Sequence, residues 1–477
     1  MTRCDVAIVG GGFSGVAVAA QLARRAESNL SVALFEDGDV GRGAAYGTPY
    51  GAHLLNTRAA AMSAFPDDPD HFVRWLDGRA APRDFVSRAT YGDYVADIAK
   101  GVFERDRFGV VRDRVVAVER AGFEFSIQTA TGRCWAARSV VLATGHASPN
   151  HDFLPQALIE HPGYVADPWR FDYRPVGGRV LVIGSGLTAL DVLVALESSG
   201  HRGAVHVLSR RGRFPEVHAD GIAPYDVLPV LDAADARSLL RSFRRHVGHA
   251  RERGFDWRAV VDALRPESEA LWARLPAREK RRFDRHLRSR WERYRHRAPQ
   301  SVDAVRERYL RAGRFHVHAG RVGGFDAGTV TIDGADGRPV RLRPDWIVNC
   351  TGPGRERRLS ADPPFARMLA DGLVSPEPLG LGIRVDADLA AIDAAGHRVD
   401  GLWVVGPLAK GSRFEATAVP ELRVMAQEVA AGALRARSRS GNGEASAQRY
   451  FCMAMQVGEL NHLYTTLPAS GSALAEN

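Results

Sequence analysis

The 477-residue sequence predicts an α/β protein built on two copies of one local pattern, with a helical segment following the second. The first observation is a short apolar run followed by G-x-G-x-x-G close to the N-terminus. The second is a similar run followed by G-x-G-x-x-A, about 170 residues later. The third is a stretch over residues 232–312 with helical periodicity and no strand-like run. Strands that alternate with helices favour parallel sheets.

The first copy has the features of a dinucleotide-binding unit. An apolar strand over Val6–Val9 leads into Gly10, which permits a tight turn. Gly12 lets the backbone approach a pyrophosphate, and Gly15 lets the next helix pack close to the strand. The N-terminus of that helix attracts phosphate. The following strand ends in Glu36, where an acid accepts a hydrogen bond from a ribose hydroxyl.

The second copy differs from the first at the end of its second strand. Gly184, Gly186 and Ala189 reproduce the glycine pattern after an apolar strand. The second strand ends in Arg210 and Arg211 where the first copy has an acid. Arginines in this place suit a 2′-phosphate, which they bind with bidentate geometry. The sequence therefore predicts FAD at the first site and NADPH at the second.

Three further strands end in small residues that let the chain pass close to a bound dinucleotide. Thr144 and Gly145 follow an apolar strand, and Gly352 follows another. A strand near the C-terminus ends at Gly406 and precedes a helix whose first turn contains Pro420. The N-terminus of that helix could face the flavin and stabilise negative charge on it.

The segment over residues 41–66 is rich in glycine and reads as a long ordered loop. Its LLNTRAAAM stretch, which ends in Met62, is costly to expose, so we expect it to be buried near the flavin. His53 and Asn56 are the candidate catalytic residues, as hydrogen-bond partners of the flavin or of activated oxygen. The alternative is that either side chain simply satisfies buried backbone groups.

Composition excludes several classes. Apolar residues make up 45% and charged residues 25% of the chain, as in ordinary globular proteins. The four cysteines are scattered without a C-x-x-C pair, so we expect no metal site and no dithiol redox centre. No apolar run approaches the ~18 residues that span a bilayer. The chain enters a strand without a preceding basic segment, so we expect no membrane association and a cytoplasmic location.

The net charge of +8 is concentrated in residues 232–312, where 22 Lys and Arg residues face 12 Asp and Glu residues. Such a segment could meet nucleic acid, but a charge-rich helical segment is more often a solvated face, and we favour that interpretation. Trp291 and Tyr294 lie three residues apart and are expected to pack in the core rather than to stack on bases.

The order of these motifs resembles flavoproteins with two dinucleotide-binding domains. More narrowly, the chain is similar to bacterial FAD-NAD(P)-binding proteins related to amino-acid N-hydroxylating flavin monooxygenases of the aspartate N-monooxygenase type. The stretches that carry this resemblance are GRGAAYG, HLLNTRAAAMSAFPDDP, YGDY, LSRRGRFPEVH, WERYRHR, NCTGPG and GPLAKGSRFEATAVPELR. The chain departs from the ATGY motif of ornithine and lysine N-hydroxylases, because it has ATGH at residues 143–146.

The resemblance implies two Rossmann-like domains: a glutathione-reductase-like FAD domain made from both ends of the chain, and an inserted NADP domain. The expected divisions are FAD domain 1–165, NADP domain 166–345 with a helical insert at 232–312, FAD domain 346–436 and a C-terminal tail 437–477. The candidate cofactor-binding residues are Gly10, Gly12, Phe13, Ser14, Gly15, Glu36, Asn56, Met62, Thr144, Gly145, Gly184, Gly186, Arg210, Arg211, Gly352, Gly406 and Thr417.

The activity that the resemblance implies is N-hydroxylation of a small amine or amino acid, with NADPH reducing FAD and molecular oxygen as co-substrate. One alternative is an NADPH-dependent reductase that passes electrons to another acceptor without oxygenation. Another is a flavin-containing nucleic-acid-binding protein that uses the basic insert. The fate of the NADPH electrons separates the first two, and a steep salt dependence of binding would identify the third.

Overall fold

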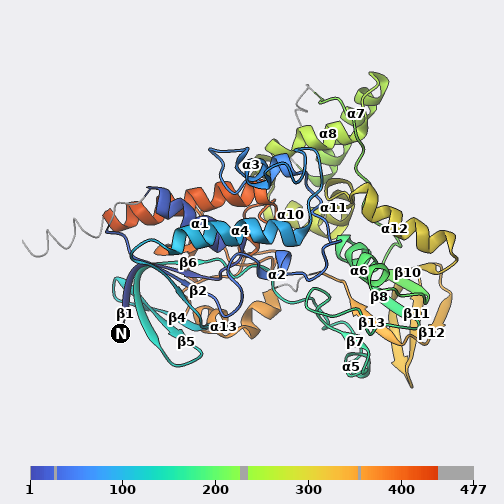
Figure 1. Cartoon of the computed structure of the whole chain (residues 1–477), viewed down its shortest axis with the longest axis horizontal. Helices are drawn as coiled ribbons and strands as arrows, with labels where there is room; N and C mark the ends of the chain where they lie inside the picture. Colours follow the sequence, from blue (N-terminus) through green and yellow to red (C-terminus); the bar gives the residue numbers. More distant parts are fainter. Residues whose placement is uncertain (1, 26–28, 226–234, 353–355, 439–477) are drawn as a thin grey trace, which may run out of the picture.

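The computed structural model describes residues 2–25, 29–225, 235–352 and 356–438. The predicted tail beyond residue 438 lies outside these residues. Two sheets lie at opposite ends of the molecule, and a group of helices stands above the second one (Figure 1). Among the described residues no helix is long and apolar enough to cross a membrane, and no cluster of acidic, histidine or cysteine side chains could hold a metal.

The first sheet joins the two ends of the chain. Its main path has the order β14-β15-β6-β1-β2-β3, parallel from β15 to β3. Helix α1 packs on α4, and a further helix covers residues 419–438 with Pro420 in its first turn, as predicted. The bounds are β1 Thr2–Val9, β2 Val32–Phe35, β3 Phe108–Val111, β6 Cys134–Leu142, β14 Ala390–Ile392, β15 Arg398–Val404, α1 Phe13–Arg25 and α4 Arg88–Phe103.

A hairpin of β4 (Val115–Ala121) and β5 (Glu124–Thr129) extends this sheet from β6. The sequence suggests one strand over residues 110–120, and this is wrong, because the chain turns at Asp113. The Asp113 carboxylate accepts hydrogen bonds from the Arg114 amide and from Thr131, which fixes the turn. Residues before it pair with β2, and residues after it pair with β5.

The second sheet has the order β12-β11-β10-β9-β8-β13-β7 and is parallel from β10 to β7. The sequence predicts antiparallel strands in this part of the chain, and the structure has them as β10, β11 and β12. β7 and β13 extend this sheet beyond both predicted limits of the inner domain, residues 166 and 345, because each hydrogen-bonds into it. The bounds are β7 Tyr164–Val165, β8 Val180–Ile183, β9 Val205–Ser209, β10 Phe315–Asp326, β11 Thr329–Gly334, β12 Pro339–Leu342, β13 Trp346–Asn349, α6 Leu187–Ser198 and α12 Gln300–Arg311.

The predicted helical insert 232–312 is helical over 235–312, and residues 232–234 lie outside the described residues. Asp235 begins α7 with a capping box, in which its carboxylate accepts from the amides of Arg237 and Ser238. The helices are α7 Ala236–Glu252, α8 Trp257–Leu264, α9 Ser268–Arg274, α10 Ala277–His286 and α11 Arg288–Arg295, with η2 Arg265–Glu267 between α8 and α9. The shorter elements are α2 Gly43–Tyr46, η1 Ala59–Ala61, α3 His71–Leu76, α5 Gln156–Ile159, η3 Glu356–Ala361, α13 Pro363–Ala370 and η4 Pro407–Ala409.

Candidate active site

The carboxyl ends of β1 and β6 meet at one edge of the first sheet, where ligands bind in open parallel sheets. Gly10 turns the chain here with a φ of +105°. A Cβ at Gly10 would lie 2.5 Å from the Ala143 carbonyl oxygen, so only glycine fits between these two strand ends. Thr144 and Gly145 continue from β6 along the same edge.

The start of α1 leaves room for a ligand. A Cβ at Gly15 would lie 1.9 Å from the Gly10 carbonyl oxygen, so this glycine sets the close contact of helix and turn. A Cβ at Gly12 would meet nothing nearer than the Gly43 Cα at 3.8 Å. Phe13 and Ser14 open the helix, whose first amides have no intrahelical acceptors. This cradle fits the pyrophosphate of FAD.

Glu36 is held in place beside this cradle. Its carboxylate accepts hydrogen bonds from the Gly11 amide at 2.7 Å and from the Gly38 amide at 2.9 Å. These two bonds orient the carboxylate but leave acceptor capacity, because a carboxylate can accept about four hydrogen bonds. The geometry therefore fits the predicted bond to a ribose hydroxyl.

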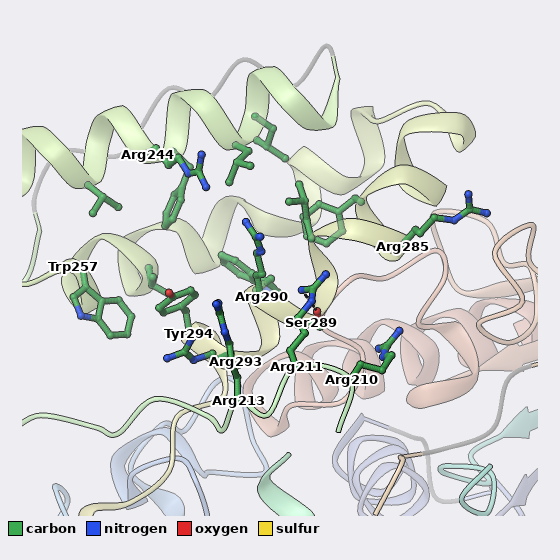
Figure 2. A pocket seen from close by; sticks show the side chains of 18 of the residues that line it. Arg210, Arg211, Arg213, Arg244, Trp257, Arg285, Ser289, Arg290, Arg293 and Tyr294 are labelled. Carbon is green, nitrogen blue, oxygen red and sulfur yellow. Dashed lines mark hydrogen bonds between the residues drawn. The ribbon is translucent and has the colours of Figure 1, made fainter. Parts of the chain in front are cut away.

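The second motif has the same division between a tight glycine and an open one. Gly184 has a φ of +117°, and its Cβ would lie 2.1 Å from the Cys350 carbonyl oxygen. Gly186 precedes α6 and faces open space, with nothing within 4 Å of a built Cβ. Arg210 and Arg211 follow β9 and are exposed, and Arg211 donates a hydrogen bond to Ser289 on α11 at 3.2 Å. Figure 2 shows both arginines beside a cavity.

Four other predicted residues lie at strand or loop ends, and a fifth, Met62, lies in the core. Gly145, Gly352 and Gly406 have φ between +75° and +86°, which suits glycine. Gly406 lies against Ser14, whose Oγ would be 3.0 Å from a Cβ there. Thr417 is half-buried just before the helix over 419–438. Met62 is 3% exposed and packs in the core of the first sheet. The contacts of these residues with a cofactor stay predictions.

His53 contacts the second domain. Its Nε2 donates to the Asp191 carbonyl oxygen of α6 at 2.9 Å, so its Nδ1 accepts from Thr48 at 2.8 Å. Burial, with a smaller effect from the charge of Arg88, lowers the pKa of His53 to about 4. Both ring nitrogens of the neutral form are therefore occupied within the protein. This arrangement favours the structural alternative for His53 over the catalytic one.

Asn56 also lies where the loop over residues 41–66 meets the second domain. Its backbone carbonyl oxygen accepts a hydrogen bond from His218 Nε2 at 3.0 Å. Arg58 nearby forms an ion pair with Asp220 at 2.7 Å. The half-buried side chain of Asn56 has no hydrogen-bond partner among the described residues, so it stays a candidate contact for a cofactor.

The structure adds a polar cluster beneath α11 that the sequence did not indicate. Lys410 Nζ lies 3.7 Å from Glu292, and Arg295 Nε lies 3.5 Å from Glu415 Oε1. Burial lowers the pKa of Lys410. His146 touches solvent but is flanked by protein, and desolvation, helped by the charge of Lys410, lowers its pKa to about 4.

Two buried atoms of this cluster, Glu415 Oε1 and Arg295 Nε, have no hydrogen-bond partner. They form an ion pair with each other at 3.5 Å, and their missing hydrogen bonds make the pair a candidate contact for a small polar ligand. The sequence did not indicate this cluster because its residues come from distant parts of the chain. One signal was available: Lys410 is one of only three lysines in a chain of 64 basic residues.

Two family models match the chain. One, described as FAD-NAD(P)-binding, matches residues 7–147, and the other, described as L-lysine 6-monooxygenase/L-ornithine 5-monooxygenase, matches residues 79–222. A search of curated proteins finds no match.

Several solved structures share the fold. The ornithine hydroxylase from Pseudomonas aeruginosa is 16% identical, with a TM-score of 0.62 over 91% of this chain and 100% of that one. The ornithine N-hydroxylase from Kutzneria sp. 744 is also 16% identical, with a TM-score of 0.60 over the same shares. The bacillithiol disulfide reductase from Staphylococcus aureus is 13% identical, with a TM-score of 0.58 over 91% of this chain and 99% of that one.

The likeness to oxygenases and to a reductase shows a shared fold and does not choose between their reactions. The two family matches and the two glycine cradles agree in kind and in position along the chain. The chain therefore has the fold of proteins with two dinucleotide-binding domains, and its residues 7–147 match an FAD-NAD(P)-binding family model.

Proposed function

We propose that the protein is an NADPH-dependent monooxygenase that hydroxylates the nitrogen of a small amine or amino acid. The observation that carries this proposal is the cluster of both charges at Lys410, Arg295 and Glu415, in which Glu415 is buried and the two cations are half-buried. A zwitterionic amino acid needs a cation for its carboxylate and an anion for its amino group. The lysine/ornithine monooxygenase match over residues 79–222 supports the same reaction class.

When bound, FAD and NADPH supply hydride transfer and oxygen activation. The chain's part is to bind, orient and exclude water. Arg210 and Arg211 would hold the 2′-phosphate, and the open space at Gly12 would admit the FAD pyrophosphate. Lys410 would attract a substrate carboxylate, and Glu415 Oε1 would accept a hydrogen bond from the substrate amine.

Ion pairs between the insert and the C-terminal segment close this region. Arg265 on the insert forms a two-bond pair with Glu421, at 2.6 and 2.7 Å. Trp272 donates a hydrogen bond to the Gly411 carbonyl oxygen at 2.8 Å. These contacts hold the helices against the segment that contains Lys410, so they would limit the access of water to the amine.

The second candidate is a reductase that transfers no oxygen, the reaction class of the disulfide reductase that shares this fold. That candidate needs an external acceptor. Of the three described cysteines, Cys4 and Cys350 are buried with pKa values raised by burial, and Cys134 is exposed and far from both in sequence. No described cysteines form a disulfide. A buried thiol with a raised pKa, as at Cys4 and Cys350, is a poor nucleophile.

The test follows NADPH oxidation by the FAD-loaded protein with a panel of amino acids and amines, and measures hydroxylamine product and hydrogen peroxide together. A true substrate should turn peroxide release into stoichiometric hydroxylamine. Lys410→Met should raise the KM for that substrate roughly tenfold, the loss expected for one charge-assisted hydrogen bond, without slowing flavin reduction by NADPH.

Lys100→Met is the matched control, because Lys100 is exposed on α4. If every amine leaves peroxide stoichiometric with NADPH, or if an added electron acceptor takes all the electrons, the protein is a reductase.

A further inference from the structure

The cavity beside Arg210 and Arg211 lies between the helical insert and the turn after β9, away from the edge of the first sheet. Its volume is about 1450 Å³. Sites for small molecules usually occupy ~300–1000 Å³, so this space exceeds what the phosphate end of one nucleotide needs. Figure 2 shows α7 on one side of it and the turn with Arg210, Arg211 and Arg213 on the other.

The wall formed by the insert is apolar. Leu240 and Phe243 of α7, Trp272 of α9, Phe283 of α10 and Trp291 of α11 all line the space. Trp272 and Phe283 are otherwise buried, with 2% and 8% of their surfaces exposed. A cavity lined by such groups lacks the dispersion contacts that a packed core would provide. The wall is therefore suited to an apolar ligand group.

Tyr294 belongs to this wall as well. The sequence led us to expect core packing for both Trp291 and Tyr294. Trp291 does pack against Phe414, but Tyr294 is 37% exposed and lines the cavity edge-on to Trp257. Because the cavity lies where the helices would otherwise pack together, Tyr294 has no hydrophobic core to pack into.

The cavity is also strongly basic, with arginines on the turn after β9 and on the insert helices α7, α10 and α11. Nine arginines line the cavity against two aspartates. Arg210, Arg244 and Arg290 have no ion-pair partner among the described residues, whereas Arg282 and Arg288, which do not line the cavity, are paired. Arg282 pairs with Glu279 at 3.0 Å, and Arg288 pairs with Asp284 at 2.5 Å. Cationic side chains gathered around one cavity attract an anion.

We propose that this cavity binds an amphipathic organic phosphate, whose apolar chain lies among the aromatic residues of the insert and whose phosphate lies between Arg244 and Arg290. A phosphate suits the cluster better than a carboxylate does, because it has more charge and more acceptor oxygens. The site is separate from the Lys410 cluster, and the proposal holds whether or not the enzyme transfers oxygen.

The test uses dodecyl phosphate as the probe and calorimetry on the FAD-loaded protein, with saturating NADP⁺ present to occupy Arg210 and Arg211. One molecule should bind per chain. Dodecanol and inorganic phosphate, which each supply half of the chemistry, should bind at least roughly tenfold more weakly.

The double variant Arg244→Gln/Arg290→Gln should weaken dodecyl phosphate binding at least about tenfold. Both side chains are exposed, so the fold should tolerate the change. Arg281→Gln removes the same charge from α10 outside the cavity and should change nothing. Leu240→Trp should weaken the probe by filling the apolar half.

The proposal is overturned if inorganic phosphate binds as well as the probe, if Arg281→Gln weakens binding equally, or if NADP⁺ abolishes probe binding. The last result would assign the whole cavity to the nicotinamide cofactor. Lysophosphatidate and palmitoyl-coenzyme A, compared under the same conditions, distinguish a lipid phosphate from an acyl nucleotide. Palmitate that binds as tightly as both would also overturn the choice of phosphate.

Discussion

The two glycine motifs are alike at the turn and differ at the end of the next strand. In both, the first glycine is forced by a carbonyl oxygen of a neighbouring strand end, and the later one, Gly12 or Gly186, faces open space. Glu36 is fixed by two backbone amides, whereas Arg210 has no ion-pair partner among the described residues and faces a cavity. The glycine turn, which both motifs share, sets the local fold. We expect the residues at the end of the second strand, which differ, to select the nucleotide.

The largest effect should come from the open glycines. Gly12→Leu should leave less than about a tenth of the chains with FAD, because the side chain would occupy the approach of the pyrophosphate. The apoprotein should still fold, since a Cβ there meets only the Gly43 Cα at 3.8 Å. Flavin absorbance per chain measures the loss.

Gly186→Leu is the matched change in the second motif. The protein should still fold and keep FAD, because a Cβ at this position meets nothing within 4 Å in the protein. The leucine side chain should occupy the space predicted for NADPH and so impair reduction by NADPH. A Gly12→Leu protein that stays fully yellow would show that FAD does not lie over this helix.

The next effect tests the difference between the motifs. Changing Arg210 and Arg211 to alanine should reduce the preference for NADPH over NADH by tenfold or more, because a charge-assisted hydrogen bond contributes ~1.5–3 kcal/mol. The ratio of kcat/KM for the two cofactors is the measurement. Arg202→Ala, an exposed arginine before β9, is the control for net charge. Equal losses with NADPH and NADH would contradict a 2′-phosphate at these arginines.

The smallest effect concerns the contact between the two halves. The pKa of His53 is lowered to about 4 in the folded protein, so protonation favours the unfolded chain. Its contribution to stability is intact above the ordinary pKa of about 6.5 and is lost as pH falls from there towards 4. The expected loss at pH 5.5 is about 1 kcal/mol.

Thermal unfolding of the wild type and of His53→Gln between pH 7.5 and 5 measures this effect. The variant should be less stable at pH 7.5, because it loses bonds to Thr48 and to Asp191. Its melting temperature should fall less steeply with acid. Parallel curves for the two proteins would mean that His53 is not the group that titrates.

The sequence by itself determined the two cradles and their order. Strand, glycine and helix are neighbours in the chain, so spacing alone predicts Gly10, Gly12 and Gly15 in their places, and the helical character of 235–312 follows from periodicity. The strand end at Glu36 is local in the same sense. The contacts of these residues with nucleotides stay predictions.

Only the tertiary structure decided what lies between distant segments. Lys410 meets Glu292 and His146 because three separate parts of the chain converge at one sheet edge, and no local pattern encodes that convergence. Likewise the second bond of His53 is made to α6, far along the chain, and this bond favours the structural interpretation of His53 over the catalytic one. The physical reason is that local spacing fixes the backbone of each unit, whereas burial, charge pairing and cavities depend on which units pack together.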